Sequence, residues 1–266
     1  MVQREILKET FRAYIEEAAR MPFAGWNFEY LTKTGRVVEA PVKWNYYSIV
    51  LPYLLKAETM LDMGTGGGEV LSGFPSLPQN TFATEQYRPN VAIARERLEP
   101  LGVKVFEIQE EKTPPYNASL PFDNGFFDLI INRHEAYYPR ELMRILKPER
   151  IFITQQVGSI NALSLRQFLM GKDETIANWN LKSAIEELKS TGFDILEQQE
   201  DIQFYRFYDA GAVAYFMKAI PWIIDDFTID EYKDRLWELH VQIQENGFYD
   251  TQQHRFIVVA QKGSKA

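Results

Sequence analysis

Apolar residues recur along this chain at two different spacings, and the changes between them outline the elements of the fold. Apolar positions in the first 20 residues follow helical spacing, which predicts an amphipathic helix there. Residues 21–44 mix proline, glycine and aromatic side chains, a composition typical of an ordered loop or short strands. A further helix is predicted over residues 45–56, where Pro52 either kinks the helix or delays its start.

From Thr59 onwards the pattern changes to short apolar runs separated by stretches of helical length or spacing. The predicted strands are residues 59–63, 81–84, 104–108, 128–132 and 150–155. The predicted helices between them are residues 69–74, 89–98 and 139–146, and Gly102 and Pro148 stand where two of these helices should stop. Because strands that alternate with helices pair in parallel, the pattern predicts a doubly wound sheet.

The remainder of the chain adds two more predicted strands and a long insertion. Helices are predicted over residues 162–169 and 181–189, a sixth strand over 193–197 and the last strand over 255–260. Between these two strands, amphipathic segments at 211–220 and 229–245 indicate a helical insertion over about residues 209–250, which we interpret as a lid or substrate-binding element. The predicted fold class is therefore α/β, a doubly wound, seven-stranded, mostly parallel sheet over residues 57–266, preceded by an N-terminal helical extension over 1–56.

Composition narrows the functions that this fold could carry. The 266 residues are 45% hydrophobic and 25% charged, which is typical of a globular protein with a substantial core. The absence of cysteine excludes disulfides, zinc ribbons and thiol nucleophiles. A net charge of −8 has the wrong sign for a broad phosphate-binding face, so a small-molecule substrate is favoured over nucleic acid. No apolar run reaches the roughly 20 residues of a membrane span, and we expect a cytoplasmic protein without a membrane partner.

The most informative segment is the glycine-rich run Met60-Leu61-Asp62-Met63-Gly64-Thr65-Gly66-Gly67-Gly68-Glu69. Glycine at these points permits positive φ and lets backbone approach a ligand closely, and the helix that follows directs its N–H groups into the same crevice. A dinucleotide-binding loop would have its third glycine where this chain has Glu69, a carboxylate that would repel a pyrophosphate. A second acid, Glu85, ends the next strand, where its carboxylate can accept both hydroxyls of a ribose. The loop therefore predicts a site for a nucleoside without phosphate.

Two later segments extend this pattern. Leu120-Pro121-Phe122-Asp123-Asn124-Gly125-Phe126-Phe127-Asp128 leads into the fourth strand, and Glu141-Leu142-Met143-Arg144-Ile145-Leu146-Lys147-Pro148 precedes the fifth. With the glycine-rich run, these segments resemble the class I, Rossmann-like S-adenosylmethionine-dependent methyltransferases of the type 11 kind, over about residues 55–200. The resemblance implies a methyltransferase whose cofactor is S-adenosyl-L-methionine.

The resemblance also implies roles for particular residues. Asp62 and Gly64 would line the methionine end of the cofactor, Gly66 and Gly68 would allow close approach, and Glu85 would bind the ribose. Thr65, Gln86 and Asn132 complete the candidate cofactor set. Many members place an aspartate after the third strand for the adenine amino group, whereas this chain has Gln109 and Glu110, either of which offers an acceptor oxygen.

The acceptor should lie beyond the carboxyl ends of the strands, where the fourth strand leads into Arg133 and His134. His134 is the candidate general base, because an unperturbed imidazole titrates near neutral pH, although a structural hydrogen-bonded histidine is the alternative. Asp128 is interpreted as structural. The candidate substrate residues are Trp44, Tyr46, Arg133, Tyr137 and Trp222, for which core packing is the competing explanation. His240 and His254 show no metal-ligand spacing, so no metal is expected.

The leading hypothesis is methyl transfer to a small molecule. A methyltransferase acting on ribosomal or transfer RNA is the first alternative, opposed by the missing basic RNA-binding module. A protein that binds S-adenosylmethionine without transferring its methyl group is the second, because methyl transfer requires no invariant catalytic residue that could be seen to be missing. A nicotinamide-dependent dehydrogenase is disfavoured by Glu69.

Overall fold

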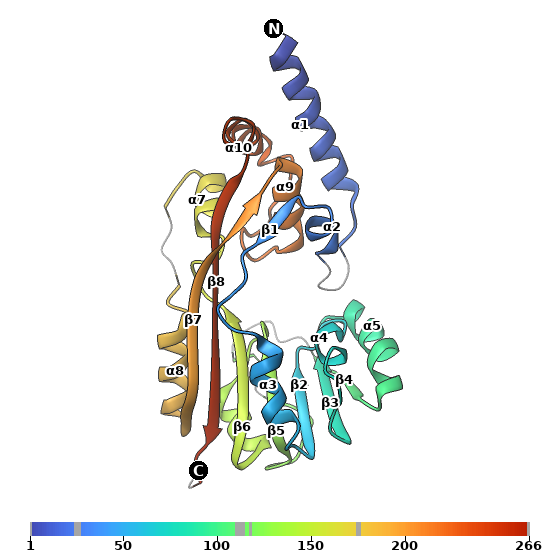
Figure 1. Cartoon of the computed structure of the whole chain (residues 1–266), viewed down its shortest axis with the longest axis vertical. Helices are drawn as coiled ribbons and strands as arrows, with labels where there is room; N and C mark the ends of the chain where they lie inside the picture. Colours follow the sequence, from blue (N-terminus) through green and yellow to red (C-terminus); the bar gives the residue numbers. More distant parts are fainter. Residues whose placement is uncertain (1, 24–27, 110–114, 117–118, 174–176, 265–266) are drawn as a thin grey trace. The chain divides into compact units, whose positions relative to one another are not determined.

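The computed structural model describes residues 2–23, 28–109, 115–116, 119–173 and 177–264. The chain divides into two compact units (Figure 1). Unit 1 comprises Met1–Pro41, Ser159–Ala177 and Ile202–His254, and unit 2 comprises Val42–Gly158, Asn178–Asp201 and Arg255–Ala266. The domain boundary expected near residue 56 stays a prediction.

Unit 2 is built on five parallel strands. They are β2 (Thr59–Met63), β3 (Asn80–Glu85), β4 (Lys104–Glu107), β5 (Phe127–Arg133) and β6 (Leu146–Val157), in the spatial order β6-β5-β2-β3-β4. Residues 255–261 of β8 (Tyr249–Lys262) pair with β6 in the antiparallel direction, and β7 (Phe193–Phe207) follows β8 in the sheet. The predicted doubly wound α/β class is confirmed, and the direction of chain progression reverses between β2 and β5.

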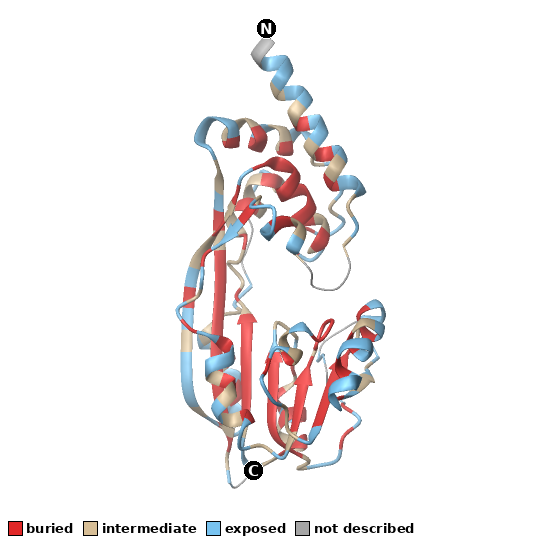
Figure 2. Cartoon of the chain, turned by 45° about the vertical axis from the view of Figure 1, so that its right-hand side comes forward, coloured by how far each residue is buried: buried red, intermediate tan, exposed pale blue. Residues whose placement is uncertain are grey.

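Helices cover both faces of this sheet because side chains on each strand point alternately to either side. Met60 packs with α3 (Tyr46–Leu54), α4 (Glu69–Ser72) and α5 (Arg88–Leu98) on one face. The next residue, Leu61, packs with α6 (Pro139–Ile145) and α8 (Leu181–Ser190) on the other. The central strands are consequently buried along nearly their whole length, as the red ribbons in Figure 2 show. The chain turns after α5 through the short 3₁₀ helix η1 (Glu99–Leu101), which ends at Gly102 as the sequence predicted.

The two segments that carry the second and third family motifs contact each other. Arg144 of α6 donates to the carbonyl oxygens of Leu120 and Phe122 at 3.0 and 2.7 Å, and Glu141 accepts from the Leu120 N–H at 2.6 Å. These contacts hold the segment that enters β5 against α6. The Glu141 and Arg144 side chains therefore have a structural role, because they fix the segment that leads into β5.

Asp128 has a structural role, as predicted. Its carboxylate accepts from the N–H groups of Glu58 and Thr59 at 3.1 and 3.0 Å and from the ammonium of Lys147 at 2.9 Å. Burial opposes ionisation of this carboxyl, but the hydrogen bonds from Lys147 and Thr59 outweigh it and lower the pKa of Asp128. Asp128 thus joins β2, β5 and β6 at the ends of β2 and β5 opposite the glycine-rich loop.

Unit 1 contains the other α-helices of the described residues. They are α1 (Val2–Arg20), α2 (Glu29–Thr32), α7 (Leu163–Met170), α9 (Ala210–Ala219) and α10 (Lys233–Asn246). Every residue of α9 except Lys218 is buried, so this helix is the centre of the unit. Such all-round burial requires a helix that is apolar on every side, as the sequence from Ala210 to Ala219 is. The helices predicted at 211–220 and 229–245 are therefore α9 and α10, the second of which begins only at Lys233.

The described residues form eight strands rather than the seven predicted. The additional strand is β1 (Val37–Glu39), which pairs antiparallel with the last three residues of β7. Strand β7 was predicted to end at residue 197, and β8 was predicted to begin at 255, so both are longer than expected. Residues 202–207 of β7 and 249–254 of β8, which lie within these extensions, belong to unit 1.

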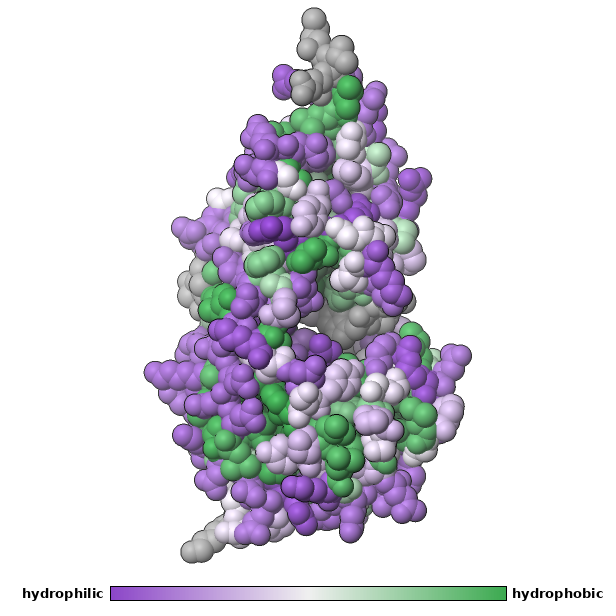
Figure 3. Space-filling view, in the orientation of Figure 1, coloured by the Kyte–Doolittle hydropathy of each residue, from purple (hydrophilic) through white to green (hydrophobic). Residues whose placement is uncertain are grey.

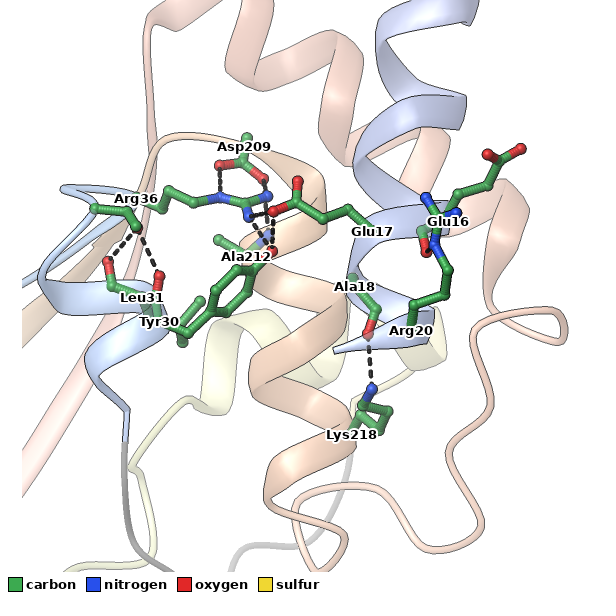
Figure 4. A network of polar contacts seen from close by, with 11 residues as sticks. Glu16, Glu17, Ala18, Arg20, Tyr30, Leu31, Arg36, Asp209, Ala212 and Lys218 are labelled. Carbon is green, nitrogen blue, oxygen red and sulfur yellow. Dashed lines mark hydrogen bonds and ion pairs between the residues drawn. The ribbon is translucent and has the colours of Figure 1, made fainter. Parts of the chain in front are cut away.

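A network of charged side chains joins α1, α2 and α9 within unit 1 (Figure 4). The guanidinium of Arg36 donates to both carboxylate oxygens of Asp209, at 2.7 and 2.6 Å, and also contacts Glu17 and Tyr30. Asp209 in turn accepts from the Ala212 N–H at 2.8 Å and so caps the N-terminus of α9. Charge pairing and capping together hold the start of α9.

Unit 1 also carries a groove of about 870 Å³. Phe11 and Ile15 of α1 and Trp237 of α10 are among its apolar lining residues, and Lys8 and Arg12 of α1 are among the charged ones. Its volume lies within the range of small-molecule sites. A substrate-binding role for the insertion stays a prediction.

Hydrophilic residues dominate the surface of both units in the view of Figure 3. Within the described ranges, no helix has both the length and the apolar composition that crossing a bilayer requires.

Candidate cofactor and acceptor site

The glycine-rich loop between β2 and α4 adopts the backbone conformation that its sequence predicts. Gly64, Gly66 and Gly68 have φ values of 65°, 62° and 81°, all in the left-handed region that L side chains rarely enter. A Cβ on Gly68 would lie 2.7 Å from the Leu98 side chain, so a glycine there also lets α5 pack closely against the loop. Replacement of any of these three glycines by a residue with a side chain would therefore strain the loop.

Glu85 holds this loop from the end of β3. Its two carboxylate oxygens accept from the Gly66 N–H at 2.7 Å and from the Tyr87 N–H at 2.8 Å. Burial raises the pKa of Glu85, and the backbone hydrogen bonds partly offset that effect. Since a carboxylate oxygen can accept more than one hydrogen bond, both oxygens retain the capacity to accept ribose hydroxyls.

Asp62, the last residue but one of β2, is buried beside the same loop. Burial, reinforced by the charge of Glu85, raises its pKa from 3.8 to about 7, although the Thr65 hydroxyl and Arg133 act in the opposite direction. Arg97 pairs with Glu69 on the outer side of the loop. The inner side thus holds two carboxyl groups whose ionisation the surroundings disfavour, an arrangement that a cationic ligand would stabilise.

Two buried polar groups next to these carboxyls have no hydrogen-bond partner among the described residues. They are the Tyr46 hydroxyl, at the start of α3, and the Asn132 side-chain N–H₂ group, near the end of β5. Burial, reinforced by the charge of Asp62, raises the pKa of the Tyr46 hydroxyl well above 10, while Arg133 acts in the opposite direction. Buried polar groups are normally paired, so these two offer hydrogen bonds to a ligand.

The carboxyl ends of β5 and β6 form a polar cluster. The Asn132 side-chain oxygen accepts from the Thr154 hydroxyl at 2.9 Å and from the Gln156 amide at 2.6 Å. Trp44 donates its indole N–H to the side-chain oxygen of Gln155 at 2.8 Å. The Gln155-Gln156 pair therefore orients residues that the sequence had singled out separately.

The contact between Trp44 and Gln155 determines which ring nitrogen of His134 carries the proton. Because the Gln155 oxygen accepts from Trp44, its N–H₂ group faces His134 Nε2 at 3.2 Å, so Nε2 accepts and Nδ1 carries the proton. Burial, together with the charges of Arg255 and Arg133, holds the pKa of His134 well below 6.5. The backbone φ of His134 is 64°, a strained value for a residue with a side chain. His134 is consequently neutral and hydrogen-bonded at the nitrogen that could accept a proton.

Glu135, which follows His134, approaches the glycine-rich loop from the β5 side. A Cβ on Gly64 would lie 2.5 Å from both Cβ and Cγ of Glu135. The carboxylate accepts from the side-chain N–H₂ of Gln86 at 3.2 Å. Gln86 follows β3, so this contact extends from the end of β5 to the end of β3 over Gly64.

The other sequence candidates lie in different surroundings. Gln109 is exposed after β4, and Glu110 lies outside the described residues. Tyr137 is buried in the core of unit 2, where its ring packs on Phe152, and Trp222 belongs to unit 1 and is 62% exposed. Within unit 2, the structure therefore brings together the loop glycines, Asp62, Glu85, Tyr46, Arg133, Asn132 and His134, whereas Tyr137 lies in the core of that unit.

No sequence pattern singled out Glu135, because its contact with Gly64 joins residues 71 positions apart. The pairing of Thr154 and Gln156 with Asn132 was likewise not predicted, because alternate residues of a buried strand show no local signal for which side chains pair. The described residues contain no cluster of three or more histidine, aspartate or glutamate side chains arranged to hold a metal ion.

Comparison with known proteins supports the fold. No family profile matches the sequence, and no curated protein matches it. A Bacillus halodurans C-125 protein described as a candidate methyltransferase has a similar structure, with a TM-score of 0.54 at 16% identity over 82% of this chain and 99% of that protein. The YcgJ protein of Bacillus subtilis gives 0.51 at 17% identity over 82% and 99%. A functionally unknown protein of Deinococcus radiodurans R1 gives 0.53 at 14% identity over 85% and 90%. This chain therefore shares the Rossmann-like α/β fold of these three proteins, one of which is described as a candidate methyltransferase.

Proposed function

We propose that this chain is an S-adenosylmethionine-dependent methyltransferase that acts on a small-molecule acceptor. The observation that carries the proposal is the pair of buried carboxyls, Asp62 and Glu85, which lie at the ends of β2 and β3 beside the glycine-rich loop. A site of this kind favours a ligand that brings positive charge. S-adenosylmethionine carries a sulfonium and an α-ammonium group and no phosphate.

The residues of the loop fit such a ligand. Glu85 would accept the ribose hydroxyls, Asp62 and Gly64 would line the methionine end, and the positive φ of Gly66 and Gly68 would keep the backbone bare beside the nucleoside. The unpaired N–H₂ of Asn132 and hydroxyl of Tyr46 are available to bind polar atoms of the cofactor or the acceptor. Gln109 or Glu110 would accept from the adenine, and Thr65 and Gln86 would border the same ligand.

The bound cofactor would supply an electrophilic methyl group, so the protein has to orient the acceptor and, where needed, receive a proton. Trp44, Tyr46 and Arg133 are the proposed acceptor-binding residues. His134 is the candidate proton acceptor, and this role would require Nε2 to leave Gln155. The net charge of −8 favours a small molecule over RNA as the acceptor.

Isothermal titration calorimetry with S-adenosylmethionine and S-adenosylhomocysteine tests the cofactor assignment. Gly66→Arg should abolish binding, because the side chain would enter the site. Gly102→Arg is the matched control, since Gly102 also has positive φ, at 81°, but faces open space away from the loop. Equal circular dichroism spectra of the two variants would show that both fold.

Failure of both nucleosides to bind the unsubstituted protein at sub-millimolar concentration would refute the cofactor assignment. Transfer of labelled methyl groups to a panel of metabolites then tests the acceptor class, with ribosomal and transfer RNA in parallel. Labelling of RNA alone would replace the small-molecule assignment. Cofactor binding without transfer to any acceptor would favour a non-catalytic binding protein.

A further inference from the structure

Three acidic side chains approach the glycine-rich loop, and they differ in how they are held. Asp62 is buried at the end of β2, and Glu85 is bound to backbone N–H groups of the loop. Glu135 instead comes from the segment after β5, and its side chain is only half-buried. It is therefore the least buried of the three acids.

The side chain of Glu135 lies directly on Gly64. A Cβ on that glycine would be 2.5 Å from Cβ and Cγ of Glu135 and 2.8 Å from its carboxylate Oε2. Glycine at position 64 is thus needed for two reasons: its φ of 65° and the space that Glu135 occupies. The carboxylate covers the part of the loop that, under the proposed function, receives the methionine end of the cofactor.

The main chain and the side chain of Glu135 are held differently. Its backbone carbonyl accepts from Gln156 at 2.9 Å, and Gln156 belongs to the buried cluster at the end of β6. Its carboxylate Oε1 accepts from the neutral Gln86 side chain at 3.2 Å and from the Ala136 N–H at 3.1 Å. Rotation of the side chain would exchange these neutral donors for a ligand while the main chain stays in place.

We propose that Glu135 recognises the α-ammonium group of the cofactor's amino-acid portion and occupies that subsite over Gly64 when the cofactor is absent. This inference rests on the proposed function and deepens it. A charge-assisted hydrogen bond from an ammonium to a carboxylate is stronger than one from a neutral amide. The ligand ammonium therefore replaces Gln86 as the donor to Glu135. Asp62 still lines the methionine end of the cofactor, and Glu85 still accepts the ribose hydroxyls.

Two ligands that differ in the α-ammonium group test the role of Glu135 separately from the cofactor assignment. S-adenosylhomocysteine has the α-ammonium group, whereas 5′-methylthioadenosine has the same nucleoside and thioether but no amino-acid portion. Glu135→Gln keeps the shape of the side chain and removes its charge. The variant should weaken binding of S-adenosylhomocysteine about tenfold and leave binding of 5′-methylthioadenosine unchanged.

Glu58→Gln is the matched control. Glu58 is an exposed glutamate of the same unit, and it precedes β2, the strand whose other end leads to Gly64. Glu58→Gln should leave the affinities for S-adenosylhomocysteine and 5′-methylthioadenosine unchanged. Thermal unfolding of each ligand-free variant shows whether folding is preserved, and titration calorimetry gives both affinities.

The possible results distinguish the role of Glu135 from the cofactor assignment. Equal weakening of both ligands by Glu135→Gln, no weakening of either, or tighter binding of S-adenosylhomocysteine would overturn the role of Glu135 and leave the cofactor assignment intact. Failure of the unsubstituted protein to bind S-adenosylhomocysteine would overturn the cofactor assignment and the role of Glu135 with it.

Discussion

Replacement of Asp62 by asparagine provides a direct test of the electrostatics of the loop. In the folded protein the pKa of Asp62 is raised, mainly by burial, from 3.8 to about 7. A carboxyl whose pKa is higher in the folded than in the unfolded chain binds more protons when folded, so its contribution to stability is present at low pH and is lost as pH rises. The loss should occur between about pH 4 and pH 7.

The size of the effect follows from that interval. At 1.36 kcal/mol per pKa unit, the difference between 3.8 and about 7 corresponds to about 4 kcal/mol of unfolding free energy at pH 8. Asparagine has nearly the same shape and does not ionise. Relative to the unsubstituted protein, Asp62→Asn should therefore gain about 4 kcal/mol between pH 4 and pH 8.

Urea denaturation of both proteins at pH 4.5, 6 and 8, followed by circular dichroism and tryptophan fluorescence, measures this difference. Both proteins should be measured without ligand, because a bound cation would favour the ionised form. A difference that stays constant with pH, or one that shifts in favour of the unsubstituted protein as pH rises, would refute the assignment of a raised pKa to Asp62.

The same pKa predicts how a cationic ligand should bind. If the ligand binds only the ionised form, a pKa of about 7 leaves roughly one-eleventh of the protein competent at pH 6 and ten-elevenths at pH 8. The apparent dissociation constant of S-adenosylhomocysteine should then fall about tenfold between these values. Asp62→Asn should bind more weakly and show no such pH dependence, and a pH-independent affinity in the unsubstituted protein would contradict the linkage.

Three further predictions concern the surroundings of the site and the core of unit 1. Arg36→Met should lower the unfolding free energy by about 3 kcal/mol in a urea titration, because it leaves the Asp209 carboxylate buried without its charged partner. Lys33→Met, in the exposed pair with Glu29, should change the unfolding free energy by less than about 1 kcal/mol. Equal effects of the two substitutions would contradict the network. Gly68→Ala should destabilise by about 1–3 kcal/mol more than Gly102→Ala, because both glycines have φ of 81° but only Gly68 lies against Leu98, and equal melting temperatures would show that the loop relaxes freely. The imidazole of His134 should stay neutral between pH 6 and 8 in nitrogen NMR spectra, since burial and the charges of Arg255 and Arg133 lower its pKa; a titration midpoint above 6 would support its role as a general base.

The strand at residues 59–63 and the glycine-rich loop could be predicted from local sequence. The strand at residues 59–63 was predicted with the bounds that β2 has, because a fully buried parallel strand is a short, continuous apolar run between polar residues. The glycine-rich loop was equally clear, since its backbone conformation depends on residues within the loop itself. Such features depend on local sequence, and local sequence is sufficient to predict them.

Strands β7 and β8 illustrate the opposite case. Each is far longer than its apolar run, because polar positions such as Glu200 and Gln252 continue a strand only when a neighbouring strand is present to pair with them. Their lengths, and with them the division into two units, depend on partners distant in sequence.

The candidate site shows the same limit. Asp62, Gly66 and Glu85 could be selected from spacing alone, since parallel strands bring their carboxyl ends to one edge. The tautomer of His134, the burial of Tyr137 and the contact of Glu135 with Gly64 depend on side chains from separate strands. The sequence by itself determined the parallel strands of the sheet and the loop at its edge. Only tertiary packing decided which side chains meet there, because burial and pairing arise between residues that no local pattern connects.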